Sequence, residues 1–571
     1  MLKKLLFPVA LLFVAFPLFS QTIVSTEPEN RKVILEEFTG INCVFCPQGH
    51  AIANNIKNNY PDDFFVINIH QGGFSNPGAG QPDFRTPFGN AIVLQSYSGG
   101  GFGYPSGTVN RQNFPGREMT APGTTAMGRG NWTISSVQTI PQSSYVNVSV
   151  EAGIDESTRE LKVIVEAYYT CDSPEATNKL NVALLQNNTL GPQSGGGQGN
   201  NYNHMHRLVH LVTGQWGIDI NTTTAGSFVS ETLTYTIPAD YNNVPAVLEN
   251  MEIVVFISET TQNIPSGNGT FPILIVNDND VALKSIQNIN DMCGDEVSPV
   301  VSIQNLGFNS LTSLDIEYSI NGGAIQTYTW NGNLETLESA IVELPVVNFE
   351  LNETNNIVVT ISNDDDNSNN EVALDFNASE VFEINEVELA IQLDDNPEET
   401  TWNIKNSADE IIHSGGPYTG QTNELIELIL DLTGDDCYSF SILDSSNNGI
   451  GHCSANGSYS LKTPDGTVIA QGGDFSSEEK ITFSVMNFLS TIGFESSNFV
   501  NLYPNPTSGV LNIDTETNLD ITIFDITGKQ VFNASNVTNG EQLDLSGLNS
   551  GLYLVKMNDG INNSTQKLII K

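Results

Sequence analysis

The chain has 571 residues, with 21 Lys and Arg against 66 Asp and Glu, which gives a formal net charge of −45 at pH 7. Because like charges repel, this balance argues against nucleic acid and anionic lipid as partners. At about 150 residues per domain the length predicts roughly four domains, and six cysteines are too few for a disulfide-dense scaffold, so each needs its own explanation.

Residues 1–20 have the pattern of a secretory signal peptide. Lys3 and Lys4 precede the apolar run from Leu5 to Phe19, and the small residue Ser20 follows it. That run is shorter than the about 20 residues that a membrane-spanning helix needs, and no later run is as long. We therefore expect an exported mature chain with no transmembrane segment.

The next segment, residues 30–70, follows a strand–helix–strand pattern. Two short apolar runs, "VILEEF" and "FFVINIH", flank the helical stretch "CPQGHAIANNIKNN" (Cys46–Asn59). This order predicts a βαβ unit and therefore a parallel sheet.

Cys43 and Cys46 lie two residues apart where this helix is expected to start. The positive end of a helix and its free N–H groups favour a thiolate, so Cys43 suits a nucleophile, and Cys46 is spaced to resolve a mixed disulfide. A permanent disulfide that stiffens one turn is the alternative. A metal clip fits poorly, since zinc needs about four ligands and only His50 is near.

From Tyr145 onward the sequence consists of alternating apolar runs such as "YVNVSVEAG" and "MEIVVFIS", separated by polar turns rich in Gly and Asn. This pattern is typical of antiparallel β-sandwiches. We expect a sandwich at 144–277, an immunoglobulin-like (Ig-like) sandwich at 281–377 and a further β-sandwich module at 382–488.

The last residues, 500–571, contain "LYPNPTSGVLNI", "ITIFDITGKQVF", "GLYLVKM" and "KLIIK". In order and position these motifs resemble the C-terminal sorting domain of type A cargo of the type IX secretion system of Bacteroidota. The resemblance implies the type IX secretion machinery as a partner. It also implies export through the periplasm to the cell surface or the extracellular space.

Near the other end, "VILEEFTGINCVFCPQGH", "GYPSGTVNR" (Gly103–Arg111) and "NYNHMHRLVH" (Asn201–His210) resemble a family of secreted Bacteroidota proteins named for a twenty-eight-kilodalton outer-membrane protein. Its members join a thioredoxin-like domain to a β-sandwich. The resemblance implies an α/β thioredoxin-like domain at 21–143. The fold class is then multidomain, with several antiparallel β-sandwich domains after the α/β domain.

Two further residues match the thioredoxin pattern and take their roles from that resemblance. Glu37, on the strand before Cys43, occupies the place of the buried acid that moves a proton to the second cysteine. Pro105 matches the cis-proline that offers backbone hydrogen bonds to an extended substrate. The chain departs from thioredoxins at Asn42 and Val44-Phe45. The stretch "HQGGFSNPGAGQPDF" is expected to be an inserted loop that forms a pocket or covers the cysteines.

Three histidines in "HMHRLVH", namely His204, His206 and His210, share parity. A strand through them would place all three on one face and offer three nitrogens to a metal ion. The alternative is that they are ordinary core or surface histidines at a strand–loop junction.

The segment "CYSFSILDSSNNGIGHCSANGSYSL" suggests calcium as a cofactor. Asp444, Asn447 and Asn448 offer the oxygen ligands that calcium prefers, with Asp394 and Asp395 as further donors. The same residues also favour a plain Asx-rich turn.

The remaining cysteines allow further disulfides. Cys437 and Cys453 are expected to close the loop of this segment. Cys171 and Cys293 lie in different predicted domains, where they either bridge those domains or remain buried free thiols.

These observations support two hypotheses. In the first, the protein is a thiol-disulfide oxidoreductase in which Cys43 attacks, Cys46 resolves, Glu37 moves the proton and Pro105 presents backbone to a protein thiol or disulfide substrate. In the second, it is a non-enzymatic surface adhesion or binding protein that uses the thioredoxin-like fold as a scaffold. Whether the protein is an enzyme is left open by the sequence, because function depends on the site and not on the fold.

Overall fold

The computed structural model describes residues 23–97, 103–432, 434–453, 456–486, 500–515, 517–560 and 563–571. The predicted signal peptide therefore lies outside the described residues. The chain divides into two compact units, Met1–Met486 and Asn487–Lys571. Among the helices of the described residues, none is long and apolar enough to cross a bilayer.

The predicted βαβ unit is confirmed. Strand β1 (Val33–Thr39) and strand β2 (Phe64–His70) pair in parallel, and helix α1 (Cys46–Asn59) connects them. Strand β3 (Ser106–Val109) pairs antiparallel with the other edge of β1. The helix begins at Cys46 with Pro47 in its first turn, where a missing N–H has no consequence for helical hydrogen bonding.

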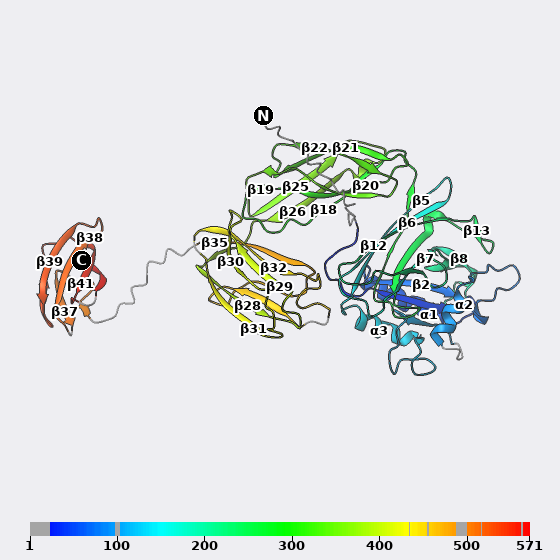
Figure 1. Ribbon diagram of the computed structural model, residues 1–571, viewed down its shortest axis with the longest axis horizontal. Coiled ribbons are helices and arrows are strands. Elements are labelled where there is room, and N and C mark those ends of the chain that lie inside the picture. Colours follow the sequence, from blue (N-terminus) through cyan, green and yellow to red (C-terminus); the bar gives the residue numbers. More distant parts are fainter. Residues whose placement is uncertain are drawn as a thin grey trace, which may run out of the picture. The chain divides into compact units, whose positions relative to one another are not determined.

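Both faces of this sheet are covered (Figure 1). Helix α1 and helix α3 (Trp132–Thr139) pack on the face to which Val33 and Leu35 point. Helix α2 (Gly89–Tyr97) packs on the opposite face, against Ile34 and Phe38. Successive residues of a strand point to opposite faces, so Glu37 faces α1 and Glu36 faces the other side.

One sheet continues across the boundary expected between residues 143 and 144. Its order is β16-β15-β7-β10-β2-β1-β3-β4, with β11 paired to β7. The strands not yet given are β4 (Met127–Gly128), β7 (Asn178–Gln186), β10 (Arg207–Leu211), β11 (Ile218–Ile220), β15 (Met251–Ser258) and β16 (Gly267–Thr270). The CxxC segment and the following β region thus share one framework, here called the first module (residues 23–275).

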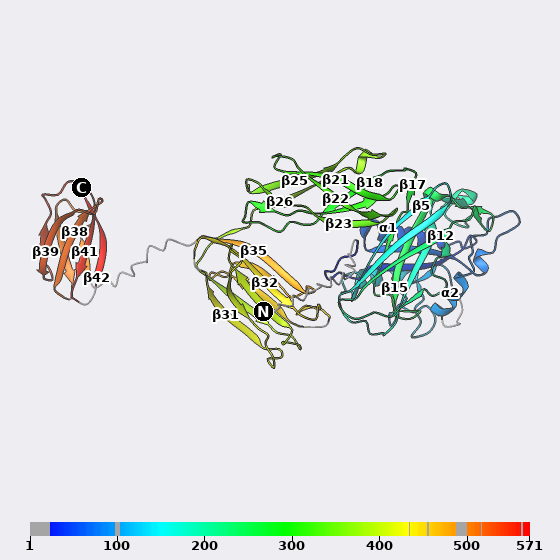
Figure 2. The same ribbon diagram turned by 45° about the horizontal axis from the view of Figure 1, so that its top comes forward.

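A second sheet completes this module and packs on the first through a large apolar core (Figure 2). It has the order β12-β6-β5-β17. Its strands are β5 (Val146–Asp155), β6 (Glu160–Tyr169), β12 (Phe228–Thr236) and β17 (Ile273–Ile275). Two short pairs, β8 (Thr189–Gly191) with β9 (Tyr202–His204) and β13 (Asp240–Tyr241) with β14 (Val244–Pro245), lie in the connections.

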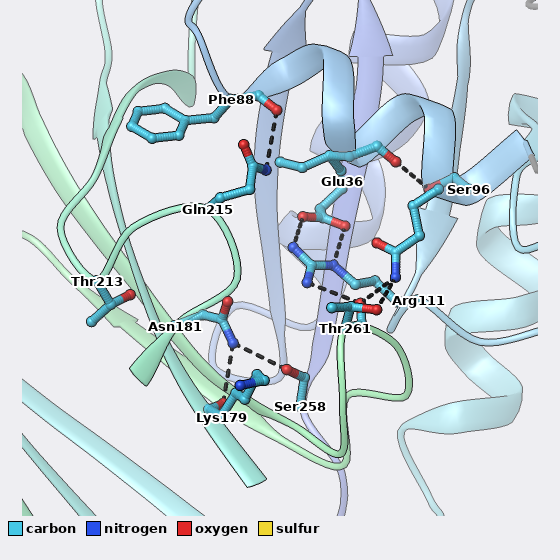
Figure 3. A network of polar contacts seen from close by, with 12 residues as sticks. Glu36, Phe88, Ser96, Arg111, Lys179, Asn181, Thr213, Gln215, Ser258 and Thr261 are labelled. Atoms are coloured by element: carbon cyan, nitrogen blue, oxygen red, sulfur yellow. Dashed lines mark hydrogen bonds and ion pairs between the residues drawn. The ribbon is translucent and has the colours of Figure 1, made fainter. Parts of the chain in front are cut away.

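Arg111 forms a buried ion pair with Glu36 and also links the two halves of the first module, residues 23–143 and residues 144–275 (Figure 3). The guanidinium of Arg111 donates to both carboxylate oxygens of Glu36, at 2.8 Å and 2.6 Å, and to the carbonyl of Thr261 at 3.3 Å. The same group lies over the rings of Trp216 and Phe256. The Arg of the "GYPSGTVNR" motif is therefore a structural residue.

The second module, Val281–Asn377, is a sandwich of a three-stranded and a four-stranded sheet, with a small additional pair. Its strands are β18 (Val281–Ile286), β19 (Glu296–Val297), β20 (Val300–Asn305), β21 (Leu311–Ile320), β22 (Gln326–Leu334), β23 (Ser339–Glu343), β24 (Val347–Asn348), β25 (Thr354–Ile361) and β26 (Glu371–Asn377).

The third module, Val381–Met486, packs a five-stranded sheet on a four-stranded one. Its strands are β27 (Val381–Glu383), β28 (Glu386–Gln392), β29 (Thr400–Lys405), β30 (Ile411–Gly415), β31 (Leu425–Asp431), β32 (Asp436–Asp444), β33 (Ser458–Lys462), β34 (Val468–Gly472) and β35 (Glu478–Met486).

The C-terminal unit is a small antiparallel sandwich with its own core. Its strands are β36 (Val500–Tyr503), β37 (Val510–Thr515), β38 (Leu519–Asp525), β39 (Gln530–Val537), β40 (Gln542–Asp544), β41 (Gly551–Asn558) and β42 (Asn563–Ile570). A tight turn joins β38 to β39, in which Gly528 has a φ of 79° and its N–H donates to the Asp525 carbonyl.

Candidate functional site

The CxxC pair forms a disulfide at the N-terminal end of α1. Cys43 and Cys46 are joined with their Cα atoms 5.4 Å apart, which confirms the expected pairing. Both are buried, with exposed fractions of 2% and 0%. Val44 and Phe45 between them are exposed. The turn thus presents an apolar surface, while its sulfur atoms lie beneath it.

A Gly-rich segment of the first module, residues 192–201, lies over this turn and is here called the cover loop. The side-chain amide of Gln193 donates to the carbonyls of Cys43 at 2.9 Å and of Gly40 at 3.2 Å. A Cβ at Gly195 would collide with the Val44 carbonyl, and Gly195 has a φ of 77°, so only glycine fits there. The cover loop therefore lies closely over the disulfide, held by the Gln193 amide, the close approach at Gly195 and a hydrogen bond from the Ser194 N–H to the Ile41 carbonyl at 2.7 Å.

The inserted loop expected at residues 70–84 lies on another side of the turn. The N–H of Asn42 donates to the Phe74 carbonyl at 2.8 Å, and the Ser75 hydroxyl donates to the Thr39 carbonyl at 2.9 Å. Phe74 is exposed and, with Tyr104, lines a cavity of about 310 Å³. The cavity is consistent with the expectation that this loop forms a pocket, and the two hydrogen bonds hold the loop beside the turn that carries the cysteines.

Glu37 lies fully buried against the first turn of α1. Its Oε1 is 2.6 Å from the position that a Cβ on Gly49 would take, so the glycine allows the carboxyl group to lie against the helix. Neither carboxyl oxygen has a hydrogen-bond partner among the described residues. Burial raises the pKa of Glu37 well above its ordinary value.

The imidazole of His50, one turn after Cys46 on α1, lies close to Glu37. His50 Nε2 lies 3.7 Å from Glu37 Oε1 and 3.0 Å from the Thr39 hydroxyl oxygen. His50 Nδ1 lies 2.7 Å from the hydroxyl oxygen of Tyr202, at the start of β9. A line of polar groups thus runs from Glu37 to the end of the cover loop.

The electrostatics keep these groups in their neutral forms. Burial, together with the nearby His204 and His206, lowers the pKa of His50 to about 3. Burial and the charge of Glu37 raise the pKa of Tyr202 to about 12. At neutral pH the imidazole therefore has one nitrogen that donates and one that accepts a proton.

Pro105 lies beside the N-terminal part of α1. The Tyr104–Pro105 peptide bond is cis. The Pro105 Cβ is 2.9 Å from the position of a Cβ on Gly49, which is the same point that Glu37 approaches from β1. The structure therefore brings Glu37, Pro105 and the first turn of α1 together.

The prediction of a metal site made by His204, His206 and His210 is wrong. His206 has a φ of 51°, so the strand breaks there and the shared parity is lost. His204 packs against His70 and Phe84, His206 contacts Glu252 with Nδ1 at 2.7 Å, and His210 stacks on Tyr235. Each histidine has its own partner on a different element.

The predicted Cys437–Cys453 disulfide is also wrong. Cys437 is the second residue of β32, and Cys453 follows the opposite end of that strand, so about 23 Å of strand separates Cys437 from Asp444 at that end. Instead Cys453 pairs with Cys171, and Cys437 pairs with Cys293. Neither expectation for Cys171 and Cys293 holds, because each is bonded to the third module.

The predicted calcium ligands form an Asx turn. Asp444 Oδ1 accepts from the N–H groups of Ser446 and Asn448, both at 3.1 Å. Burial, with Glu399 and Asp394 nearby, raises the pKa of Asp444 to about 6. Asn447, with a φ of 60°, and Asn448 line a polar cavity of about 580 Å³.

Only one group of three His, Cys or acidic ligand atoms within 4.8 Å occurs among the described residues, and it consists of Cys171, His452 and Cys453. Its sulfurs are already joined in a disulfide. Calcium binding at Asp444 therefore remains a prediction.

Sequence reasoning missed His50 as a partner of Glu37, and it missed Tyr202 and Gln193. The position of His50 four residues after Cys46 was a usable signal, because residues at that spacing share a helix face. Tyr202 lies 152 positions from His50, and nothing in the local sequence indicates that contact.

Comparisons with known proteins find matches in the C-terminal unit and in the first module. Residues 501–571 match the model of the secretion system C-terminal sorting domain, and residues 96–266 match that of the outer membrane protein Omp28. The second match starts within α2 and ends after β15, so it spans both halves of the first module. None of the curated proteins that were compared matches the chain.

Among solved structures, HBP35 of Porphyromonas gingivalis is similar at 15% identity and a TM-score of 0.35, over 61% of this chain and 99% of that one. A domain of the outer membrane lipoprotein Omp28 from the same organism is similar at 18% identity and a TM-score of 0.17, over 23% and 90%.

The two family matches together assign the chain to an exported class. The sorting domain implies handling by the type IX secretion machinery. With the Omp28-related region, it indicates export to the cell surface or the extracellular space.

Proposed function

We propose that the protein is an exported thiol-disulfide exchange protein whose thioredoxin-like site is the Cys43–Cys46 pair. One observation carries this proposal. Glu37 is a fully buried carboxyl group without a hydrogen-bond partner among the described residues, and it lies against the helix turn that the pair opens.

Energetics favour an active role over a permanent staple. Burying a polar group without a compensating hydrogen bond costs about 1–3 kcal/mol by mutational data. A structural disulfide gains nothing from such a neighbour. A buried group with a raised pKa is what proton transfer to a sulfur requires, because it holds its proton near neutral pH.

The exchange proceeds in two displacement steps. A thiolate of a substrate protein attacks Cys43 Sγ, the Cys43–Cys46 bond breaks, and Cys46 leaves and takes the proton of Glu37. A second substrate thiolate then attacks the substrate sulfur of the mixed disulfide, and Cys43 leaves as a thiolate near the positive end of α1. The substrate loses two electrons and becomes a disulfide, and the pair gains them and ends as a Cys46 thiol and a Cys43 thiolate. The protons that the two substrate thiols lose on forming thiolates pass to solvent, and Glu37 must regain the proton that it gave to Cys46.

The surface around the pair suits a protein substrate. Val44, Phe45 and Phe74 are exposed apolar side chains beside the turn. Pro105 would present backbone groups to an extended segment, as the thioredoxin resemblance implies. The cover loop must move aside for a sulfur to be reached.

The test is oxidation of reduced ribonuclease A by the full mature chain. We expect acceleration by the wild type and none by Cys43→Ser or Cys46→Ser. The double variant Cys171→Ser, Cys453→Ser removes a different disulfide and should keep the activity. Failure of the wild type to accelerate oxidation would contradict the proposal and favour a surface adhesion or binding protein.

A further inference from the structure

The buried position of Glu37 raises the question of how its proton reaches solvent. Glu37 has an exposed fraction of 0%, so water cannot recharge it directly. In each exchange cycle Glu37 must lose a proton to Cys46 or gain one from it. A group that is sealed in this way needs a path.

We propose that His50 and Tyr202 form a proton relay between Glu37 and solvent, inward when Cys46 leaves as a thiol and outward when Cys46 attacks. This inference rests on the proposed function, since it needs the exchange at Cys46. It assigns a role to two positioning residues that come from different halves of the first module.

The contacts form a continuous line. His50 Nε2 is 3.7 Å from Glu37 Oε1, and His50 Nδ1 is 2.7 Å from the Tyr202 hydroxyl oxygen. The first distance must shorten by somewhat less than 1 Å for transfer, and catalytic hydrogen bonds are often long before substrate binds. Thr39, whose hydroxyl oxygen lies 3.0 Å from Nε2, fixes the plane of the imidazole.

The imidazole of His50 is suited to pass a proton on rather than to hold it. As Nε2 accepts a proton from Glu37, Nδ1 releases one to the Tyr202 oxygen, whose own proton passes to water. No charged imidazole has to persist, which agrees with the low pKa of His50. Tyr202 is partly exposed and directly follows the cover loop, so the line ends at the surface.

Several other ionisable groups of the described residues lie near the line and have contacts of their own. His206 Nδ1 lies 2.7 Å from Glu252, and the ring of His204 packs against the rings of His70 and Phe84. Arg207 is buried beside Phe84. Glu36, the neighbour of Glu37, points to the other face and is bound to Arg111.

The experiment follows the two steps of oxidation separately. The reduced full mature chain is mixed with oxidised glutathione, and mass spectrometry of the peptide that carries both cysteines follows the glutathione adduct at Cys43 and then ring closure by Cys46. In the first step Cys43 and one glutathione sulfur form a bond and the other glutathione leaves. In the second Cys46 displaces the remaining glutathione, and its proton passes to Glu37 as Glu37 passes its own proton to His50.

We expect His50→Gln and Tyr202→Phe to slow ring closure by about 10- to 100-fold, at the lower end of general acid–base effects, without changing the rate of adduct formation. In a Glu37→Gln background neither change should have a further effect. His210→Gln and Tyr145→Phe, which lie outside the line, should leave both steps unchanged. A purely structural disturbance would change the rates of both steps, in the wild-type and in the Glu37→Gln background alike.

The outcomes separate the two proposals. If the wild type forms the adduct and both variants close the ring at its rate, the relay is wrong and the exchange function stands. If the wild type forms no adduct, the exchange function fails and the relay fails with it. Should His50→Gln fail to fold, Tyr202→Phe decides, because it removes a single oxygen atom.

Discussion

Glu36 and Glu37 are neighbours on β1 with the same side-chain chemistry and the same burial, yet their surroundings differ. Glu36 faces α2 and is bound through both oxygens by Arg111. Glu37 faces α1, and neither of its oxygens has a hydrogen-bond partner among the described residues. One carboxylate is balanced by a guanidinium, and the other is held in its neutral form by burial.

The two carboxyl groups therefore suit different roles, that of Glu36 in stability and that of Glu37 in proton transfer. A buried ion pair leaves little freedom for proton transfer, because both partners are fixed in their charged forms. An unpaired buried acid lowers the stability of the fold, but it can give and take a proton. The strand thus carries a structural contact on one face and a reactive group on the other.

Removing the partner of Glu36 should have the largest effect on stability. Arg111→Met leaves the carboxylate of Glu36 buried without its partner, and we expect a loss of about 3–5 kcal/mol in the free energy of unfolding by urea. Arg117→Met, whose guanidinium bonds to the neutral side chains of Ser135 and Gln138, is the matched control and should cost far less. Equal losses in the two variants would show that the Glu36 contact is not special.

Replacing Glu37 should raise the free energy of unfolding instead of lowering it, and the gain should depend on pH. The folded pKa of Glu37 is raised, so the wild type loses stability as pH rises from the unfolded value near 4.3 toward the folded value. The stability of Glu37→Gln relative to wild type should therefore improve by about 1–3 kcal/mol between pH 4 and pH 8. A difference that does not change with pH would contradict the unpaired state of Glu37.

The stability of the protein at acid pH tests the neutral form of His50. Its folded pKa of about 3 lies below the unfolded value of about 6.5, so the wild type loses stability as pH falls from 6.5 toward 3. At pH 5.5 the loss relative to His50→Gln should be about 1.4 kcal/mol. Parallel stability curves for the two proteins between pH 7 and pH 5 would rule this out.

The smallest effect is expected at the cover loop. Gln193→Ala removes two hydrogen bonds that hold this loop on the turn, which should lower the free energy of opening by about 1 kcal/mol and speed reduction of the disulfide by dithiothreitol about fivefold. Gln198→Ala, at an exposed position of the same loop, serves as the control. Unchanged reduction of Gln193→Ala would mean that the cover loop does not limit access.

The sequence was sufficient for features that local rules determine. Hydrophobic periodicity gave α1 and its two flanking strands, whereas Glu37 and the cis bond at Pro105 were expected from the resemblance to thioredoxins. The contacts that it missed join distant segments. His50 meets Tyr202 across 152 positions, and six cysteines allow 15 pairings that local sequence does not rank. The histidine prediction failed at His206, where a single positive φ ended the alternation.

A redox titration of the full mature chain, with mass-spectrometric trapping of Cys43 and Cys46, distinguishes an exchange site from a structural disulfide. We expect a reversible two-electron transition between about −270 and −120 mV, the range of known oxidoreductases, with Cys43 as the more reactive thiol. A pair that stays oxidised below about −300 mV, or that is reduced only on unfolding, would be a structural disulfide and would contradict the account.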